Sequence, residues 1–345
     1  MAKTSICVFP ALKGFGGPSS FLAKLKKGLE ESGIAVHHDI KDPSVRAVLV
    51  IGGTRRFGKL VYAKRHGIRI IQRLDGMNWL HKKKNTGIKH YLRSERMNLQ
   101  LSLIRRFFAD AVVYQSKFTR DWWTRVYGPL QTPHTVIYNA VDLNSFSPSD
   151  TVYETKKEIR ILVVEGSFRG GHERDLKNAV DTANQIAIQA NTPVRLLIAG
   201  KVPESFKQQL HIQPAVIIEW LGMVPHDEIP DLDRSAHLFF PAEINAACPN
   251  SLIEALASGL PIIGYATGSI PELVGEDGGV VVPYNGDYWN LAEPKSEPLA
   301  KAAIGILENH KNFKHSARQR SENLFSVDHM VHAYQKMLLD PLPKE

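Results

Sequence analysis

The sequence predicts an α/β protein in which two Rossmann-like, doubly wound domains face each other across a cleft. The length of 345 residues suits about two domains. In each half, short β-branched or apolar runs alternate with helical patterns, as expected of βαβ units with parallel sheets. A polar stretch without periodicity, residues 147–158, separates the two series and places the domain boundary near residue 150.

The first series predicts an N-terminal domain over residues 1–150. A helix is indicated by the apolar spacing in PSSFLAKLKKGLEESG, and Gly33 lies just past its end, where a C-cap glycine is common. The five strands expected in this domain are Ser5–Phe9, Ala47–Ile51, Ile68–Gln72, Ala111–Tyr114 and Thr135–Tyr138.

The second series predicts a C-terminal domain over residues 151–325, with helices at 175–189 and 251–258. Helical spacing also continues from Glu297 to about Leu339. Residues 326–345 are therefore expected to form a C-terminal helix and tail that return across the first domain. The strands expected in the second domain are Arg160–Val164, Val194–Ala199, Val216–Trp220, His237–Phe240, Pro261–Gly264 and Gly279–Val282.

The excess positive charge of the chain is confined to its first half. The formal net charge is +8. Residues 1–150 contain 25 Lys and Arg against 10 Asp and Glu, whereas residues 151–345 contain 18 against 25. Either this is a solvated basic face, or the first domain meets membrane lipid, a phosphorylated acceptor or nucleic acid. Nucleic acid is not expected, because no nucleic-acid-binding module is recognisable.

The segment from Trp79 to Phe108 combines basic residues with an apolar set. Two interpretations stay open. Ordinary helix packing explains the apolar residues, whereas an anionic lipid surface would explain why they lie beside so many Lys and Arg. The apolar set is Leu92, Met97, Leu99, Leu101, Leu103, Ile104, Phe107 and Phe108.

Cysteine content and hydropathy indicate the compartment. Cys7 and Cys248 are too few for a disulfide framework and lack metal-ligand spacing. No apolar run approaches the ~18 residues that span a bilayer, and the start MAKTSICVFPAL lacks the pattern of a signal peptide. We expect a cytoplasmic protein, or one peripheral on the inner face of the cell membrane, without a metal or other cofactor.

The loop FPALKGFGGPSSF nearly matches the dinucleotide-binding fingerprint through Gly14, Gly16 and Ser19. Asp39 even lies near the position of the ribose-binding acid. Four residues separate the strand from the first glycine, however, and Pro18 lacks an N–H that would help to hold phosphate. NAD binding is therefore disfavoured, which leaves a flexible loop or a loop that approaches another phosphate-bearing ligand.

The segment from His237 to Tyr284 is the most informative. A strand is followed by an irregular loop and then by a helix that begins near Ser251, with Asn250 or Ser251 as its N-cap and Glu254 in its first turn. The free N–H groups of a helix start suit a phosphate, and a carboxylate suits the two hydroxyls of a ribose. Alternatively, Glu254 only complements the helix dipole, which contributes about 0.3–1 kcal/mol.

The run IEALASGLPIIGYATGSIPELV resembles the signature of the group 1 family of retaining glycosyltransferases, whose fold is the two-domain GT-B fold. Further stretches of the chain resemble family segments in the family's order, and together they span about residues 14 to 284. These stretches are GFGGPSSF, VVYQSKFTRDWW, VIYNAVDLNSF, EWLGMVPHDEIPDL and CPNSLIEAL.

The resemblance implies how a nucleotide-sugar donor would be held. Glu254 matches the glutamate that binds the donor ribose, and the helix start with the glycine loop would surround the diphosphate. Arg169, or less directly Arg174, would stabilise the charge of the leaving nucleotide and so act in catalysis. The full donor set implied in this way is Gly16, Gly17, Gly166, Arg169, Arg174, Asn250, Ser251, Leu252 and Glu254.

Two positions depart from the family pattern. Ala246 stands where the family has the glutamate that approaches the transferred sugar, with Glu243 three residues earlier. Ser167 and Glu173 stand where the family has an Arg and a Lys for the diphosphate. Losing one well-placed ionic hydrogen bond costs about 1.5–3 kcal/mol.

Asp75 is a second catalytic candidate. A strand is expected to end near Gln72, which would leave Arg73 and Asp75 at the carboxyl edge of the first sheet. In relatives a polar residue at this strand end touches the transferred sugar, whereas the alternative is a turn-forming Asp before Gly76. Arg73 would bind a phosphate or pair with Asp75.

The function predicted on this basis is transfer of a hexose-type sugar from a nucleotide-diphosphate donor to a glycan or lipid-linked acceptor, with retention at the anomeric carbon. The alternatives are a catalytically altered GT-B homologue that acts as a binding or scaffold protein, and a nucleotide-sugar epimerase. No general base is evident, and in the mechanism usually proposed for this family the leaving phosphate oxygen deprotonates the acceptor.

Overall fold

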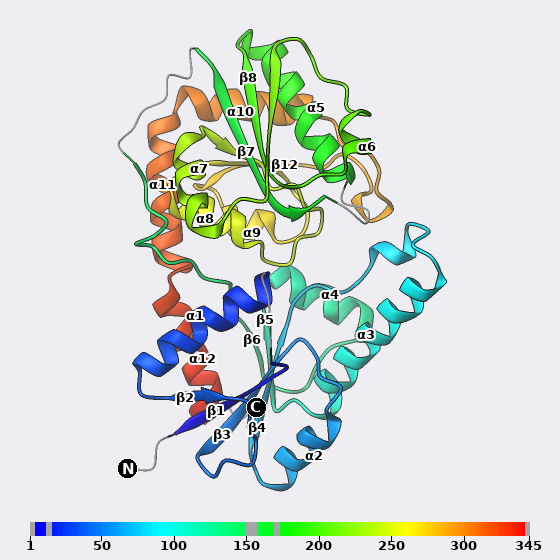
Figure 1. Cartoon of the computed structure of the whole chain (residues 1–345), viewed down its shortest axis with the longest axis vertical. Coiled ribbons are helices and arrows are strands. Elements are labelled where there is room, and N and C mark those ends of the chain that lie inside the picture. Colours follow the sequence, from blue (N-terminus) through cyan, green and yellow to red (C-terminus); the bar gives the residue numbers. More distant parts are fainter. Residues whose placement is uncertain (1–3, 12–15, 150–156, 169–172, 342–345) are drawn as a thin grey trace. The chain divides into compact units, whose positions relative to one another are not determined.

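A computed structural model describes residues 4–11, 16–149, 157–168 and 173–341 (Figure 1). The chain divides into two compact units, the first made of residues 1–140 and 327–345 and the second of residues 141–326. The boundary therefore lies earlier than the predicted residue 150. The reason is that residues after Ala140 are tied to the second unit, where the Arg318 guanidinium donates hydrogen bonds to the carbonyls of Leu143 and Phe146.

The first unit is built on a six-stranded parallel sheet in the order β2-β1-β3-β4-β5-β6. The expected strands are all present, some with shifted ends, and β2 adds an edge. The strands are β1 (Ser5–Phe9), β2 (Ala35–His37), β3 (Val45–Ile51), β4 (Arg69–Leu74), β5 (Ala111–Tyr114) and β6 (His134–Val136). The helices are α1 (Gly17–Glu31), α2 (Phe57–Arg65), η1 (Leu80–Lys82), α3 (Ile88–Phe107) and α4 (Lys117–Tyr127).

The second unit has its own six-stranded parallel sheet, in the order β12-β11-β10-β7-β8-β9. Its strands are β7 (Ile159–Ser167), β8 (Val194–Lys201), β9 (Val216–Gly222), β10 (Leu238–Phe239), β11 (Ile262–Tyr265) and β12 (Gly279–Val282). Its helices are α5 (Glu173–Ala190), α6 (Glu204–Lys207), η2 (His226–Glu228), α7 (Ile229–Ser235), α8 (Asn250–Ala257), α9 (Ile270–Val274), η3 (Tyr288–Asn290), α10 (Glu297–Glu308) and α11 (His310–Leu324).

The helical pattern that ends near Leu339 is divided among three helices, and the last of them, α12 (Val327–Leu339), belongs to the first unit. It packs beside α1, as Figure 1 shows. Tyr334 is fully buried, with its ring centroid 5.1 Å from that of Phe21 on α1. The predicted return of the C-terminal helix to the first domain is therefore confirmed.

Among the described residues, no helix combines the length and apolar character needed to cross a membrane.

The order of the strands in each sheet determines which strand ends lie next to each other. In parallel sheets all strands end at one edge, and ligands bind where neighbouring strands lead to helices on opposite faces. In the second unit this point lies at β7, which is flanked by β8 on one side and by β10 on the other. The carboxyl ends of β7 and β10 consequently lie next to each other.

Close packing of α1 against α12 generates a stability prediction. A Cβ on Gly28 would lie 2.4 Å from Cγ2 of Val331, a β-branched side chain with little freedom to move. Gly28→Ala should therefore destabilise the protein by about 1–3 kcal/mol, measured by urea unfolding. Gly305→Ala in α10 is the matched control, because nothing lies within 4 Å of its Cβ. That variant should gain about 0.5–1 kcal/mol; stabilisation of both variants would contradict the prediction.

Candidate functional site

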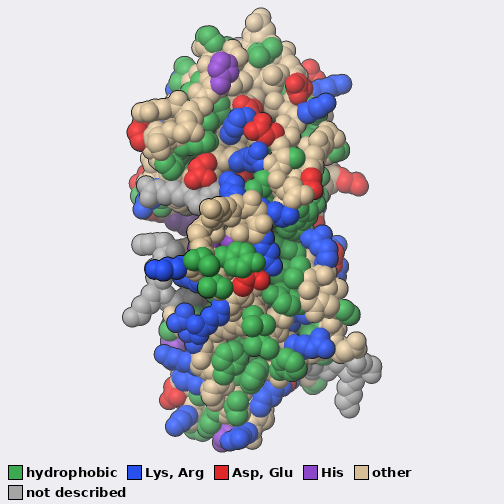
Figure 2. Space-filling view, turned by 90° about the vertical axis from the view of Figure 1, so that its right-hand side faces the viewer, with side chains coloured by type: hydrophobic (Ala, Val, Ile, Leu, Met, Phe, Trp, Pro, Cys, Tyr) green, Lys and Arg blue, Asp and Glu red, His purple; other side chains and the backbone are tan. Residues whose placement is uncertain are grey.

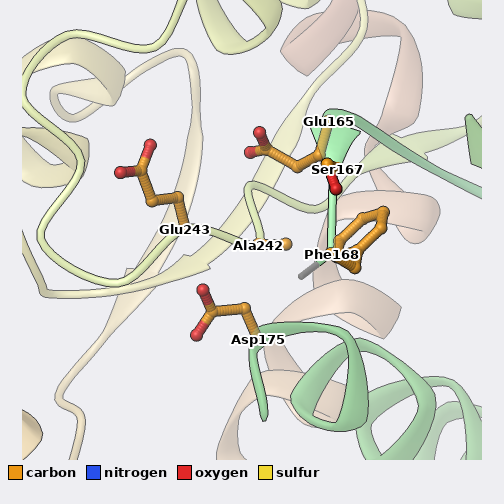
Figure 3. A pocket seen from close by; sticks show the side chains of 6 residues that line it. All are labelled: Glu165, Ser167, Phe168, Asp175, Ala242 and Glu243. Atoms are coloured by element: carbon orange, nitrogen blue, oxygen red, sulfur yellow. The ribbon is translucent and has the colours of Figure 1, made fainter. Parts of the chain in front are cut away.

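A pocket of about 140 Å³ lies in the second unit at the carboxyl ends of β7 and β10 (Figure 3). Strand β7 ends with Glu165 and Ser167 at its rim, and the loop after β10 contributes Ala242 and Glu243. Phe168 closes one wall, and Asp175 enters from the first turn of α5. The pocket thus occupies the point where the strand order of this sheet reverses.

Three carboxylates surround this pocket. Figure 3 shows Glu165, Asp175 and Glu243 around one space, each supplied by a different element. Asp175 is buried, whereas Glu165 and Glu243 are half-buried. Carboxylates accept hydrogen bonds from hydroxyl groups, so this lining suits a polyhydroxylated ligand.

The basic side chains that the sequence predicted beside the diphosphate do not line the pocket among the described residues. Ser167 lines the pocket, and Glu173 begins α5 without reaching the pocket lining. Arg174 lies 3.7 Å from the carboxylate of Glu293, so its charge is already paired. Gly166 is exposed at the end of β7. Arg169 falls outside the described residues.

Glu254 lies on α8, and its side chain is buried although it is ionisable. Its Oε1 lies 2.9 Å from Nε2 of His226, an exposed residue of η2. The prediction of its local position was wrong in two details. The N-cap is Pro249, not Asn250 or Ser251, and Glu254 lies one position beyond the first turn. Ser251 and Leu252 are the second and third residues of the helix.

This position weakens the alternative interpretation of Glu254. The stabilisation of a carboxylate by the helix dipole falls off within the first turn, and Glu254 lies beyond it. A buried carboxylate instead needs a specific partner, and the partner seen here is an imidazole that a ligand hydroxyl could replace. Glu254 on α8 and Asp233 on α7 lie close enough to interact electrostatically, so they form a pair of acidic side chains between the two helices.

Asp233 on α7 is fully buried near Glu254. The hydroxyl of Ser258 donates a hydrogen bond to Oδ2 of Asp233 at 3.1 Å. Burial, together with the negative charge of Glu254, raises the pKa of the Asp233 carboxyl well above its usual value. The Asp233 carboxyl therefore holds its proton to a higher pH in the folded protein than in the unfolded chain.

Asn245 is a candidate that the sequence reasoning missed. It precedes Ala246 in the loop after β10 and adopts φ 61°, in the left-handed region that asparagine tolerates. The residue is buried, and neither Nδ2 nor Oδ1 has a hydrogen-bond partner among the described residues. A buried amide without partners is costly, and such strained positions concentrate at functional sites.

The backbone around Asn245 is held tightly. The Ser269 N–H donates a hydrogen bond to the Ala246 carbonyl at 2.9 Å. Gly268 adopts φ +57°, and a Cβ there would lie 2.6 Å from the Ala246 nitrogen. The sequence gives one sign of this role: Asn245 directly precedes Ala246, the position at which the family has a glutamate.

In the first unit, Gly16 and Gly17 lie at the start of α1. Gly16 is the N-cap with φ +138°, a conformation that side-chain-bearing residues rarely adopt, and both glycines are exposed. Gly14 lies outside the described residues. Among the described residues, no group of three or more His, Cys, Asp or Glu is placed to hold a metal ion.

Asp75 follows β4 directly, so it lies at the carboxyl edge of the first sheet. Its carbonyl accepts a hydrogen bond from Nε1 of Trp123 at 2.8 Å. Burial raises the pKa of the Asp75 carboxyl, and the Arg73 guanidinium opposes this shift. Asp75 thus has the location that the sequence predicted.

The location predicted for Arg73 was wrong, whereas its electrostatic interaction with Asp75 is present. The strand continues to Leu74, which draws Arg73 into the core instead of leaving it at the edge. Its Nη2 donates a hydrogen bond to Asn139 at 2.7 Å, and its guanidinium lies 3.8 Å from the ring centroid of Phe21. Arg73 therefore braces α1 against the sheet.

Comparison with known proteins assigns the second unit to a family. Residues 160–309 match the sequence profile of the glycosyl transferases group 1 family. This range contains the pocket, Asn245 and Glu254, so every second-unit feature described above falls within the matched domain.

Individual relatives are distant. The chain is 24% identical over 183 residues to the phosphatidylinositol N-acetylglucosaminyltransferase gpi3 subunit of Schizosaccharomyces pombe, covering 52% of this chain and 37% of the relative. It is 26% identical over 222 residues to the N-acetyl-alpha-D-glucosaminyl L-malate synthase of Bacillus anthracis, covering 60% and 53%. The chain thus matches about a third to a half of the length of these relatives.

The fold is shared over nearly the whole chain. HepE of Anabaena, solved in complex with UDP, superimposes with a TM-score of 0.65 at 14% identity, covering 97% of this chain and 99% of the other. At this identity the likeness concerns the fold, which is the GT-B arrangement of two Rossmann-like domains.

The buried carboxyl of Asp233 generates a pH prediction. The folded protein retains this proton where the unfolded chain, with a pKa of about 3.9, has lost it, so folding is penalised as the pH rises above about 4. Asp233→Asn removes that penalty. Relative to the parent, the variant should gain stability in urea unfolding as the pH rises above about 4.

Asp231→Asn is the control for this prediction. Asp231 is exposed and pairs with Arg234 at the surface, so its removal should change stability by less than about 1 kcal/mol at either pH. A constant difference between Asp233→Asn and the parent over the whole range would contradict a raised pKa.

Proposed function

Because the second unit is a group 1 glycosyltransferase domain in a chain with the GT-B fold, we propose that this protein transfers a hexose-type sugar from a nucleotide-diphosphate donor to an acceptor with retention of anomeric configuration. In this reaction the bond between the anomeric carbon and the donor phosphate breaks, and a bond to an acceptor hydroxyl oxygen forms on the same face. The leaving phosphate oxygen takes the hydroxyl proton.

The observation that carries the proposal is the buried side chain of Glu254 near the start of α8. A carboxylate has enough acceptor sites for two ribose hydroxyls, and the neighbouring helix start presents free N–H groups to a phosphate. Nε2 of His226 lies within hydrogen-bonding distance of Oε1 of Glu254, at 2.9 Å. We propose that this imidazole orients Glu254 until ribose hydroxyls take over the contact.

The remaining parts of the site have narrower support. The pocket at β7 and β10, with its hydroxyl-accepting carboxylates, suits the transferred sugar. The relatives named above act with N-acetylglucosamine, according to their names, which supports a hexosamine or hexose donor. Gly16 and Gly17 stay predictions for the donor diphosphate, and Asp75 stays a prediction for the transferred sugar. A glycan or lipid-linked acceptor is proposed.

A second candidate function is supported by one observation. Glu165, Asp175 and Glu243 line the pocket where cations would be expected beside a diphosphate, and Ser167 stands at the family's arginine position. Such a site suits a homologue that binds a nucleotide or sugar without transferring it. A labelled donor decides between the two: product in the α-configuration from an α-linked donor supports transfer, whereas binding without turnover supports the second candidate.

Nucleotide binding provides the direct test of Glu254. Glu254→Gln removes the charge while it retains the shape of the side chain. Loss of a charge-assisted contact to ribose should weaken UDP or GDP binding by about 10- to 150-fold in calorimetry. Glu308→Gln, an exposed change elsewhere in the second unit, is the matched control. Unchanged affinity in Glu254→Gln would remove Glu254 from the site.

Asn245 provides a test of sugar recognition that is separate from nucleotide binding. We propose that its amide hydrogen-bonds the transferred sugar in place of the carboxylate missing at Ala246. Asn245→Ala should lower kcat/KM about tenfold or more and leave UDP affinity unchanged. Asn245→Asp, which retains an acceptor and tolerates φ 61°, should recover part of the activity. Equal activity of all three proteins would contradict the proposal.

A further inference from the structure

Helix α3 in the first unit has an unusual distribution of side chains. Its buried residues are Ser94, Asn98, Ile104 and Arg105, so most of the side chains that face the unit are polar. Most of its large apolar residues point outward instead. The most exposed of them are Ile88 (76%), Leu92 (62%), Leu99 (54%) and Phe107 (64%).

Polar contacts hold the helix in this orientation. Asn98 Oδ1 accepts a hydrogen bond from the Asn78 N–H at 3.0 Å. Arg105 donates one from Nε to the Tyr114 hydroxyl at 2.8 Å and one from Nη2 to the Gly128 carbonyl at 3.0 Å. The outward position of the apolar residues is therefore set by directional bonds to the sheet and its loops.

The outward residues lie on one side of the helix. Residues 88, 92, 99, 103 and 107 are separated by intervals of four and seven, which places them in one stripe. Exposed basic residues lie in and beside this stripe: Lys89, Arg93, Arg96 and Arg106. In Figure 2, which shows this face of the first unit, hydrophobic side chains form a patch bordered by Lys and Arg.

Exposed apolar patches on soluble proteins mark interaction surfaces, and the surrounding charge identifies the partner. A second copy of the chain is disfavoured, because a two-fold contact would bring the same basic residues together. The core of a protein interface is also depleted of charge. An anionic bilayer satisfies both features, since its headgroups attract Lys and Arg while its acyl boundary accepts apolar side chains.

We propose that the exposed face of α3, with Ile88, Leu92, Leu99 and Phe107 flanked by Lys89 and Arg93, docks the protein on an anionic lipid surface. Leucine and phenylalanine side chains insert below the headgroups, and the long basic side chains extend to the phosphates. This surface is independent of the proposed donor site, which lies in the second unit.

Vesicle sedimentation with the full chain tests the proposal. The protein should bind vesicles of phosphatidylcholine with phosphatidylglycerol and should not bind phosphatidylcholine alone. Binding should weaken as added salt shortens the screening length from ~8 Å to ~3 Å. Lys89→Gln with Arg93→Gln should weaken binding about 25-fold, at about fivefold for each charge. Leu92→Gln with Leu99→Gln should weaken it about tenfold or more.

Matched controls are available in the second unit. Lys301→Gln with Lys311→Gln removes two exposed charges, and Ile188→Gln removes an exposed apolar residue. These variants should bind vesicles as the parent does. Because every substituted residue is exposed, all variants should retain the parent's unfolding midpoint and UDP affinity.

Three results would overturn the proposal. The first is the absence of binding to anionic vesicles, and the second is equal loss of binding in the control variants. The third is a parent dimer in sedimentation velocity that Leu92→Gln with Leu99→Gln converts to a monomer, which would assign the face to a second copy.

Discussion

The place of β7 in its sheet is the constraint on which the candidate site depends. With β8 on one side and β10 on the other, the helices that follow β7 and β10 cover different faces of the sheet, which leaves a space at the carboxyl ends of these two strands. The pocket occupies this space, and its lining comes from the end of β7, Phe168, the start of α5 and the loop after β10. The first three lie within residues 165–175 and the last at residues 242 and 243, so the pocket joins two parts of the chain that no single motif contains.

Electrostatics distinguishes the two parts of that site. Near Glu254, burial and the negative charge of that neighbour raise the pKa of the Asp233 carboxyl well above its usual value. Around the pocket, in contrast, three carboxylates share a partly open space, and the nearby Arg174 is paired with Glu293. Negative charge there favours hydroxyl-rich ligands and opposes a diphosphate placed against the same wall. The proposed function accordingly places the donor sugar toward the carboxylates and its phosphates toward the start of α8.

Much of the architecture could be predicted from the sequence because it rests on periodicity. Strand β5 was predicted to the residue, and α12 was expected to return to the first unit, since buried strands and amphipathic helices leave regular apolar patterns. Arg73 and the domain boundary could not be predicted in the same way. Arg73 contacts Asn139 and Phe21, and residues after Ala140 are held by Arg318, all of them partners distant in sequence. The N-cap at Pro249 shifts the helix start by one residue, which is enough to take Glu254 out of the first turn.

Helix α3 shows the limit of apolar patterns most clearly. Its leucines have helical spacing, and ordinary packing was one open interpretation of them, yet solvent reaches most of these residues. The sequence records spacing but not which side of the helix faces the sheet. That choice is made by Asn98 and Arg105, whose hydrogen bonds are directional and require the polar side to face inward. Since polar anchors hold the helix, its apolar side contributes little to folding. It can therefore meet a lipid surface, or lose its leucines to substitution, without disturbing the sheet behind it.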